Sequence, residues 1–192
     1  YKFPKVNDPK PVIYEFDDKE NETFDRTLKV LANSFTFARY RPLEYLKDQS
    51  KLRNIDKVRQ SNITKFMKIL MIKRLESSYF AFKKTIGRLA ESYKKFIDQY
   101  ESGTIYVSKK NLQKVLDLLE KGDDDSVSMM VDKGDVEKYL VEDFKDSFID
   151  DLRRDYENLN LIKKDWDDVN TDSKIDKFKE ILTNDLLFKK NK

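Results

Sequence analysis

Residues 61–101 decide the fold, and they read SNITKFMKILMIKRLESSYFAFKKTIGRLAESYKKFIDQYE. This stretch lacks proline, and Gly87 is its one interior glycine, so we expect a single helix of about 60 Å at 1.5 Å per residue. Eight apolar side chains within about 80° of one another on a helical wheel predict a long packing seam. The seam consists of Met71, Leu75, Phe82, Ile86, Leu89, Tyr93, Phe96 and Tyr100.

Basic side chains form a second stripe on the same predicted helix. Lys73, Lys84, Arg88 and Lys95 fall within about 60° on the wheel, opposite the seam. Such a ridge can follow the phosphates of a duplex through counterion release, without reading bases. The predicted duplex contacts are Lys65, Lys68, Lys73, Lys84, Arg88 and Lys95. Two alternatives stay open: a solvated outer face, or a face paired with acidic helices nearer the C-terminus.

Two further groups in this stretch invite a chemical interpretation. The aromatic side chains suggest base-stacking platforms, but their helical spacing favours a place in the core. They are Tyr79, Phe80, Phe82, Tyr93 and Phe96. The small pair Ser77 and Ser78 favours close helix packing over catalysis, because no histidine is present to activate a hydroxyl.

The composition of the whole chain fits long amphipathic helices. Charged and apolar residues each make up 39% of it, and it contains four Gly and four Pro. The charge is divided along the sequence: residues 39–95 hold 16 basic and 5 acidic residues, whereas residues 111–172 hold 9 basic and 19 acidic. The first half can therefore face a polyanion and the second cannot.

Missing residue types exclude several functions. Without cysteine there is no disulfide framework or thiolate chemistry, and without histidine there is no Ser-His or Cys-His nucleophile. No glycine precedes Lys-Ser or Lys-Thr, so no phosphate-binding loop of that type is present. There is no run of 18 apolar residues and no signal peptide at the N-terminus. We expect a cytoplasmic piece of a longer protein, without membrane contact and without catalytic residues of its own.

The segments around this central stretch are predicted as follows. Residues 1–18 form an extended lead, in which the alternation at 12–16 predicts one short strand. Residues 19–120 form a basic helical region. Within it, the apolar spacing from Phe24 to Ala38 predicts a helix capped by Asp17 or Asp18, and Pro42 should interrupt that helix. Thr104 to Val107 is β-prone and is expected to pair with the strand near residue 13.

Acidic segments follow. Ser108 is expected to cap a helix through residue 119, and residues 121–135 should form an acidic flexible loop. The loop aspartates Asp123, Asp124, Asp125, Asp132 and Asp135 do not match a calcium-loop spacing, so a solvated loop is favoured over a metal site. Residues 136–192 predict one helix from Val136 to about Asp168 and another around Ile175 to Leu182.

One known pattern runs through these residues. Residues 66–78 read FMKILMIKRLESS and residues 81–85 read AFKKT, which resembles the FMK-LLLKRLESS-AF-KT pattern of bacterial Swi/Snf-type helicases of superfamily two. Two flanks agree with it. KPVIYEF at 10–16 with ENETF at 20–24 is similar to the strand and helix start leaving the first RecA-like lobe, and DSKIDKF at 172–178 is similar to the helix preceding the second lobe.

Composition and periodicity predict a mainly α fold, a bundle of long amphipathic helices with at most a short two-stranded β element. The resemblance implies that this bundle is inserted between two RecA-like lobes. The parent would be an ATP-dependent DNA helicase or translocase, a hydrolase that holds ATP and Mg²⁺ outside this chain. Expected partners are those lobes and double-stranded DNA, and the oligomeric state stays open. The alternative is a helical protein–protein interaction or structural module without DNA binding. An independent enzyme is disfavoured, because His, Cys and Gly-rich loops are absent.

Overall fold

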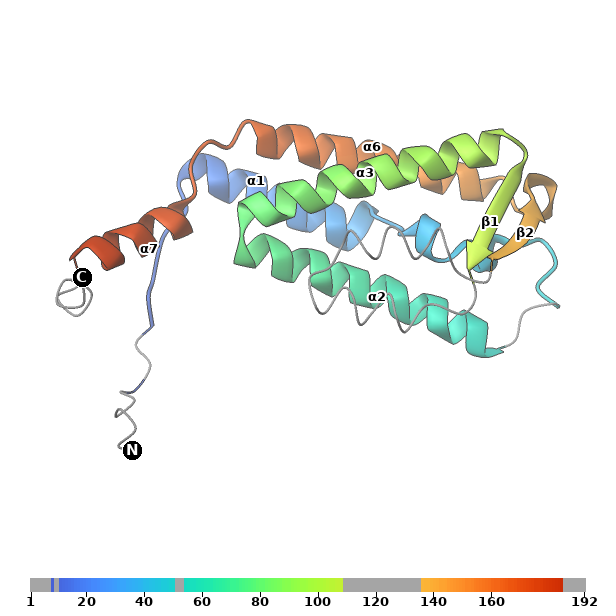
Figure 1. The fold of residues 1–192 in the computed structure, drawn as a ribbon, viewed down its shortest axis with the longest axis horizontal. Helices are drawn as coiled ribbons and strands as arrows, with labels where there is room; N and C mark the ends of the chain where they lie inside the picture. Colours follow the sequence, from blue (N-terminus) through green and yellow to red (C-terminus); the bar gives the residue numbers. More distant parts are fainter. Residues whose placement is uncertain (1–7, 9–10, 51–53, 109–135, 185–192) are drawn as a thin grey trace.

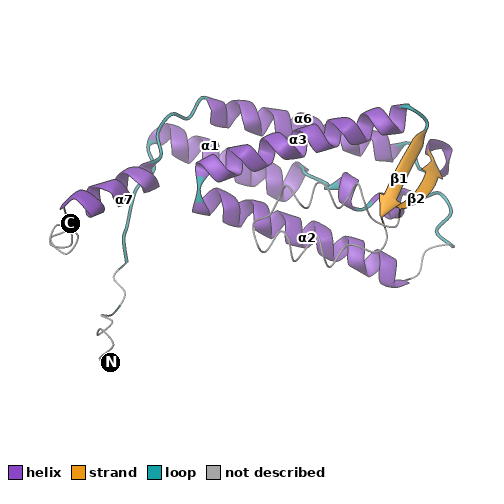
Figure 2. Ribbon diagram, in the orientation of Figure 1, coloured by secondary structure: helices purple, strands orange, loops and turns teal. Residues whose placement is uncertain are grey.

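The computed structural model describes residues 8, 11–50, 54–108 and 136–184 (Figure 1). It confirms a mainly α fold with a short two-stranded antiparallel sheet (Figure 2). The helices are α1 (Asp18–Lys29), α2 (Asn54–Ser77), α3 (Tyr79–Glu101), α6 (Ser147–Asp167) and α7 (Ser173–Asn184), and the strands are β1 (Thr104–Ser108) and β2 (Val136–Leu140). Among these described residues, no helix is both long and apolar enough to cross a membrane.

α1 begins as predicted and ends earlier than predicted. The Asp17 carboxylate accepts from the backbone N–H of Glu20, and the Glu20 side chain accepts from the N–H of Asp17, which completes a capping box. After Lys29 the chain makes one π-helical turn, Val30–Ser34, and then leaves the helix. The helix therefore does not reach Ala38 or need Pro42 to break it.

The single helix predicted over residues 61–101 is wrong. Ser78 has an extended backbone, and its hydroxyl accepts a hydrogen bond from the Ala81 N–H at 3.3 Å, which caps a new helix. α2 and α3 run antiparallel as a hairpin with Ser78 at the turn (Figure 1). Wheel angles carried across Ser78 therefore do not describe one surface.

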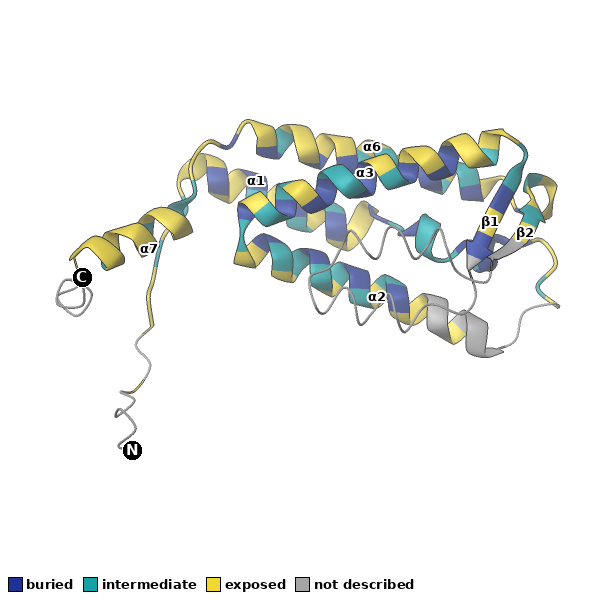
Figure 3. Cartoon of the chain, in the orientation of Figure 1, coloured by how far each residue is buried: buried dark blue, intermediate teal, exposed yellow. Residues whose placement is uncertain are grey.

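The predicted seam nevertheless lies in the core. Seven of its eight side chains are buried, and Tyr100 is half-buried (Figure 3). α3 packs along α6, which contributes Phe148, Leu152, Leu159, Ile162 and Trp166 to the same core. The core survives the break in the helix because each half keeps its own apolar stripe.

The sheet differs from its prediction in the strand that β1 pairs with. β1 pairs with β2, with Thr104 opposite Leu140 and Ser108 opposite Val136. Residues 11–17 form no strand in the part of the chain described. β2 also displaces the helix predicted to start at Val136: the chain makes a 3₁₀ turn at Val141–Asp143 and α6 begins only at Ser147.

The predictions for the C-terminal helix and for the segment after Ser108 remain. The last helix is confirmed as α7, which projects from the end of the bundle (Figure 1). The helix expected after Ser108 and the acidic loop at 121–135 lie outside the described residues, as do the loop aspartates considered for a metal site.

Candidate nucleic-acid interface

The six predicted DNA contacts are divided between two helices. Lys65, Lys68 and Lys73 belong to α2, and Lys84, Arg88 and Lys95 belong to α3. The hairpin at Ser78 thus separates Lys73 from the other members of the predicted ridge. Two shorter basic faces replace the continuous ridge.

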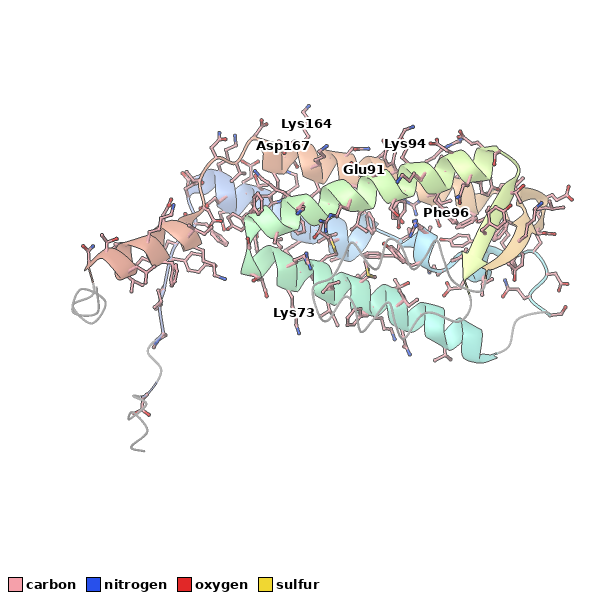
Figure 4. All side chains as sticks on the ribbon, viewed as in Figure 1. Lys73, Glu91, Lys94, Phe96, Lys164 and Asp167 are labelled. Carbon is pink, nitrogen blue, oxygen red and sulfur yellow. The ribbon has the colours of Figure 1, made fainter. Side chains whose placement is uncertain are left out.

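The α2 cations differ in their surroundings. Lys65 and Lys73 are exposed, and Lys73 points away from α3 (Figure 4). Lys68 is half-buried, and its Nζ donates to the backbone carbonyl of Ala32 at 2.9 Å. That bond satisfies a backbone carbonyl of the π-helical turn after α1, so Lys68 links α2 to this turn.

The α3 cations lie on its outer face. Lys84 and Lys95 are exposed and Arg88 is half-buried. Residues 79–90 contain three basic residues and no acidic one, whereas Glu91 brings a negative charge onto the same face before Lys95. Lys94 pairs with Asp98 at 3.7 Å in that second half. In sequence, the net positive charge of α3 therefore falls in its first half, at Lys83, Lys84 and Arg88.

The contacts between α3 and α6 bear on whether the acidic helices neutralise this face. Arg153 of α6 pairs with Glu101 of α3 at 2.8 Å. In this pair the basic residue is on α6 and the acidic residue is on α3, which is the reverse of what neutralisation of the α3 cations by α6 requires. Lys83, the neighbour of Lys84, donates to the Val169 carbonyl at 3.1 Å. Neither contact involves the Lys84 side chain, which is exposed.

Other cations of the basic half serve the fold. The Arg39 guanidinium lies 5.5 Å from the ring centroids of both Tyr40 and Phe96. Arg41 pairs with Glu44 at 3.1 Å and lies over the Tyr45 ring. The charge surplus counted in the sequence therefore overstates what the surface can offer to a polyanion.

The aromatic side chains considered as stacking platforms divide sharply. Tyr79, Phe82, Tyr93 and Phe96 are buried, as the core interpretation predicted. Phe80 is the exception, because 74% of its surface is exposed.

Sequence reasoning missed a junction at one end of the bundle, where the lead and α7 meet. Buried Glu20 accepts from the N–H of Ser173 at 2.8 Å and from the Ser173 hydroxyl. Thr171 donates to the Asp17 carboxylate at 2.6 Å, and this bond lowers the pKa of Asp17. Lys174 donates to the carbonyls of Glu76 and Ser77 at the end of α2, at 3.0 and 3.1 Å. The start of α7 is thus bonded to both α1 and α2.

A cleft of about 520 Å³ lies beside this junction, between residues 13–17 and α7. Its charged lining consists of Glu15, Asp17, Asp176, Glu180 and Lys177. Four carboxylates against one ammonium make the cleft repulsive to phosphates. A nucleic acid would therefore bind elsewhere.

A second missed feature is the buried carboxylate of Asp155, which is 0% exposed. It accepts four hydrogen bonds: from the Thr36 N–H at 2.7 Å, the Thr36 hydroxyl at 2.9 Å, the Ala38 N–H at 2.9 Å and the Tyr93 hydroxyl at 3.1 Å. Between the two N–H donors lies Phe37, a left-handed residue with φ 56°. Asp155 thus holds a turn that a non-glycine residue rarely adopts.

Burial raises the pKa of Asp155 above the ordinary value of 3.8, against the opposing effect of its hydrogen bonds. Because the folded protein then retains a proton that the unfolded chain has lost, this group's contribution to stability is present at low pH. It declines as the pH rises from the unfolded pKa through the folded one. We expect a carbon-13 NMR titration of the Asp155 carboxyl to have its midpoint above 3.8. A midpoint below 3.8 would show that the hydrogen bonds outweigh desolvation.

The described residues contain no group of three or more Asp or Glu side chains arranged to hold a metal ion. Comparisons with protein-family models, with curated proteins and with solved structures find no match for this chain.

Proposed function

We propose that this chain is a non-catalytic helical segment between the two RecA-like lobes of a cytoplasmic ATP-dependent DNA helicase or translocase. In that role it couples the lobes and contacts duplex DNA through α3. Nucleotide and Mg²⁺ are held by the parent protein outside this segment. The sequence resemblance in residues 66–85 is what suggests this class of parent.

The observation that carries the coupling role is the junction of Asp17, Glu20, Thr171 and Ser173. The chain enters the bundle through residues 11–17 and leaves it through residues 170–173, and the two segments are hydrogen-bonded to each other. A bundle whose entrance and exit lie together can be inserted into a host without separating the parts on either side. Because α7 is bonded to α1 and α2, rotation of one flanking part is transmitted to the bundle.

The duplex contact is assigned to the first half of α3. Lys84 and Arg88 lie one helical turn apart, on a stretch without acidic residues. Phosphate contacts of this kind give affinity without sequence preference, and their strength falls steeply with salt. Lys65 and Lys73 on α2 remain predicted secondary contacts.

Reversing both charges should weaken duplex binding. We expect Lys84→Glu with Arg88→Glu to lower the affinity for a labelled blunt duplex about tenfold at low salt, and to reduce the slope of log affinity against log salt by about two. Fluorescence anisotropy at low and near-physiological salt measures both quantities.

The matched control is Lys163→Glu with Lys164→Glu, which reverses two exposed charges on α6. Lys164 projects from α6 near Asp167 (Figure 4). This variant has the same net charge as the test variant. Equal loss in the two variants would mean that binding follows net charge alone, and the α3 assignment would then be withdrawn.

A second candidate function, docking to a protein, is favoured by α7. Its side chains Ile175, Phe178 and Leu182 are exposed and recur at helical spacing. A helix with such a face stabilises itself by packing against another surface. A stable complex or a homodimer that forms without DNA affinity would favour this second candidate.

A further inference from the structure

Phe80 stands apart from the aromatic side chains around it. It is the second residue of α3 and is 74% exposed, while its neighbours Tyr79 and Phe82 are buried in the core. A single exposed apolar side chain is ordinary on protein surfaces, so exposure alone decides nothing. Its alignment with charged neighbours is what distinguishes Phe80.

Lys84 and Arg88 follow Phe80 four and eight residues later, on the same face of α3. The three side chains succeed one another at about 6 Å intervals along the helix axis. A polyanionic strand laid along this face meets the ring first and then two cations. With no carboxylate among residues 79–90, nothing on this stretch of α3 repels it.

We propose that Phe80, Lys84 and Arg88 form a binding site for single-stranded nucleic acid, such as an overhang at the end of a duplex. Phe80 stacks on an unpaired base, and Lys84 and Arg88 hold the adjoining phosphates. This inference rests on the proposed function and specifies the form of nucleic acid recognised at the same face. It favours a single strand because bases within a duplex are already stacked and have no free face for the ring.

The test compares two labelled probes of equal duplex length, one blunt and one with a single-stranded overhang, by fluorescence anisotropy. We expect the overhang probe to bind about tenfold more tightly, as one stacked base contributes. Phe80→Ala should abolish this preference and leave blunt-duplex affinity unchanged. Phe80→Trp should retain it, because the larger ring also stacks.

Phe178→Ala is the matched control, because Phe178 is 59% exposed on α7. The lysines on either side of it, Lys177 and Lys179, pair with Glu180 and Asp176. The Phe178→Ala variant should keep the overhang preference.

Each remaining outcome overturns a definite claim. If the unmodified chain binds both probes equally, or if Phe80→Ala retains the preference, the stacking site is wrong while the duplex contact stands. If the unmodified chain binds neither probe at low salt, both the stacking site and the duplex contact are wrong.

Discussion

Replacing Asp155 with alanine is expected to lower the free energy of unfolding by about 4 kcal/mol, which is large for one substitution. The carboxylate accepts from the Thr36 N–H, the Thr36 hydroxyl, the Ala38 N–H and the Tyr93 hydroxyl. Alanine leaves these donors without their acceptor around a buried site, and it releases the left-handed turn at Phe37. Urea unfolding followed by far-UV circular dichroism measures the loss.

Two further variants separate the hydrogen bonds from other effects. Asp155→Asn keeps the shape and one acceptor oxygen but turns an amide toward a donor, so it should lose about half as much, roughly 2 kcal/mol. Glu157→Ala removes an exposed carboxylate from the same helix and should stay within about 0.5 kcal/mol of the parent chain. If Asp155→Ala cost no more than Glu157→Ala, the turn at Phe37 would be held by packing alone.

The position of Asp155 shows what periodicity can reveal. Phe148, Leu152, Leu159, Ile162 and Trp166 are all buried, at intervals of three, four and seven residues. Asp155 falls within this apolar stripe, three residues after Leu152 and four before Leu159. An acidic residue at a core position indicates a buried hydrogen-bond network. The spacing on α6 places Asp155 at such a position, so the sequence alone could have predicted the network. The partners of Asp155 were not predictable, because Thr36 and Ala38 lie in a turn more than a hundred residues earlier and Tyr93 lies on a different helix, 62 residues earlier.

The helix break at Ser78 marks a different limit. Apolar spacing predicted a seam of eight side chains in residues 61–101, and seven of them are buried, because burial depends on the stripe within each turn. It did not predict the reversal, since serine is tolerated inside helices and becomes a cap only where the chain can fold back. Lys84 and Lys95 are still exposed on one helix, as the ridge required. Lys73 does not share a surface with them, because the hairpin places it on another helix.

The strand β2 illustrates tertiary context overriding a local pattern. Val136, Leu140, Phe144 and Phe148 recur every four residues, which is a helical spacing. The segment at Val136–Leu140 instead pairs with β1, because the hydrogen bonds of the ladder satisfy both backbones at the end of the bundle. Only from Ser147 onward does packing against α3 favour the helix.

Glu20→Ala is expected to cost about 3 kcal/mol of unfolding free energy and to release α7 from the bundle. The buried Glu20 side chain accepts from the N–H of Asp17 and from the N–H and hydroxyl of Ser173, so its loss affects both the start of α1 and the start of α7. Glu22→Ala, at an exposed position on the same helix, should change stability by about 0.5 kcal/mol or less.

The release of α7 can be measured separately from global stability by spin labelling. Because the chain contains no cysteine, labels attach only at the cysteines that are introduced. Spin labels attached through Lys164→Cys on α6 and Lys179→Cys on α7 report the distance between the two helices by pulsed electron paramagnetic resonance. The distribution should be narrow with Glu20 present and broad in Glu20→Ala. In that variant two contacts of the junction remain: the hydrogen bonds from Lys174 to the Glu76 and Ser77 carbonyls of α2, and the hydrogen bond from Thr171 to Asp17. An unchanged narrow distribution would mean that those remaining bonds are sufficient to hold α7, and that Glu20 does not fix its position.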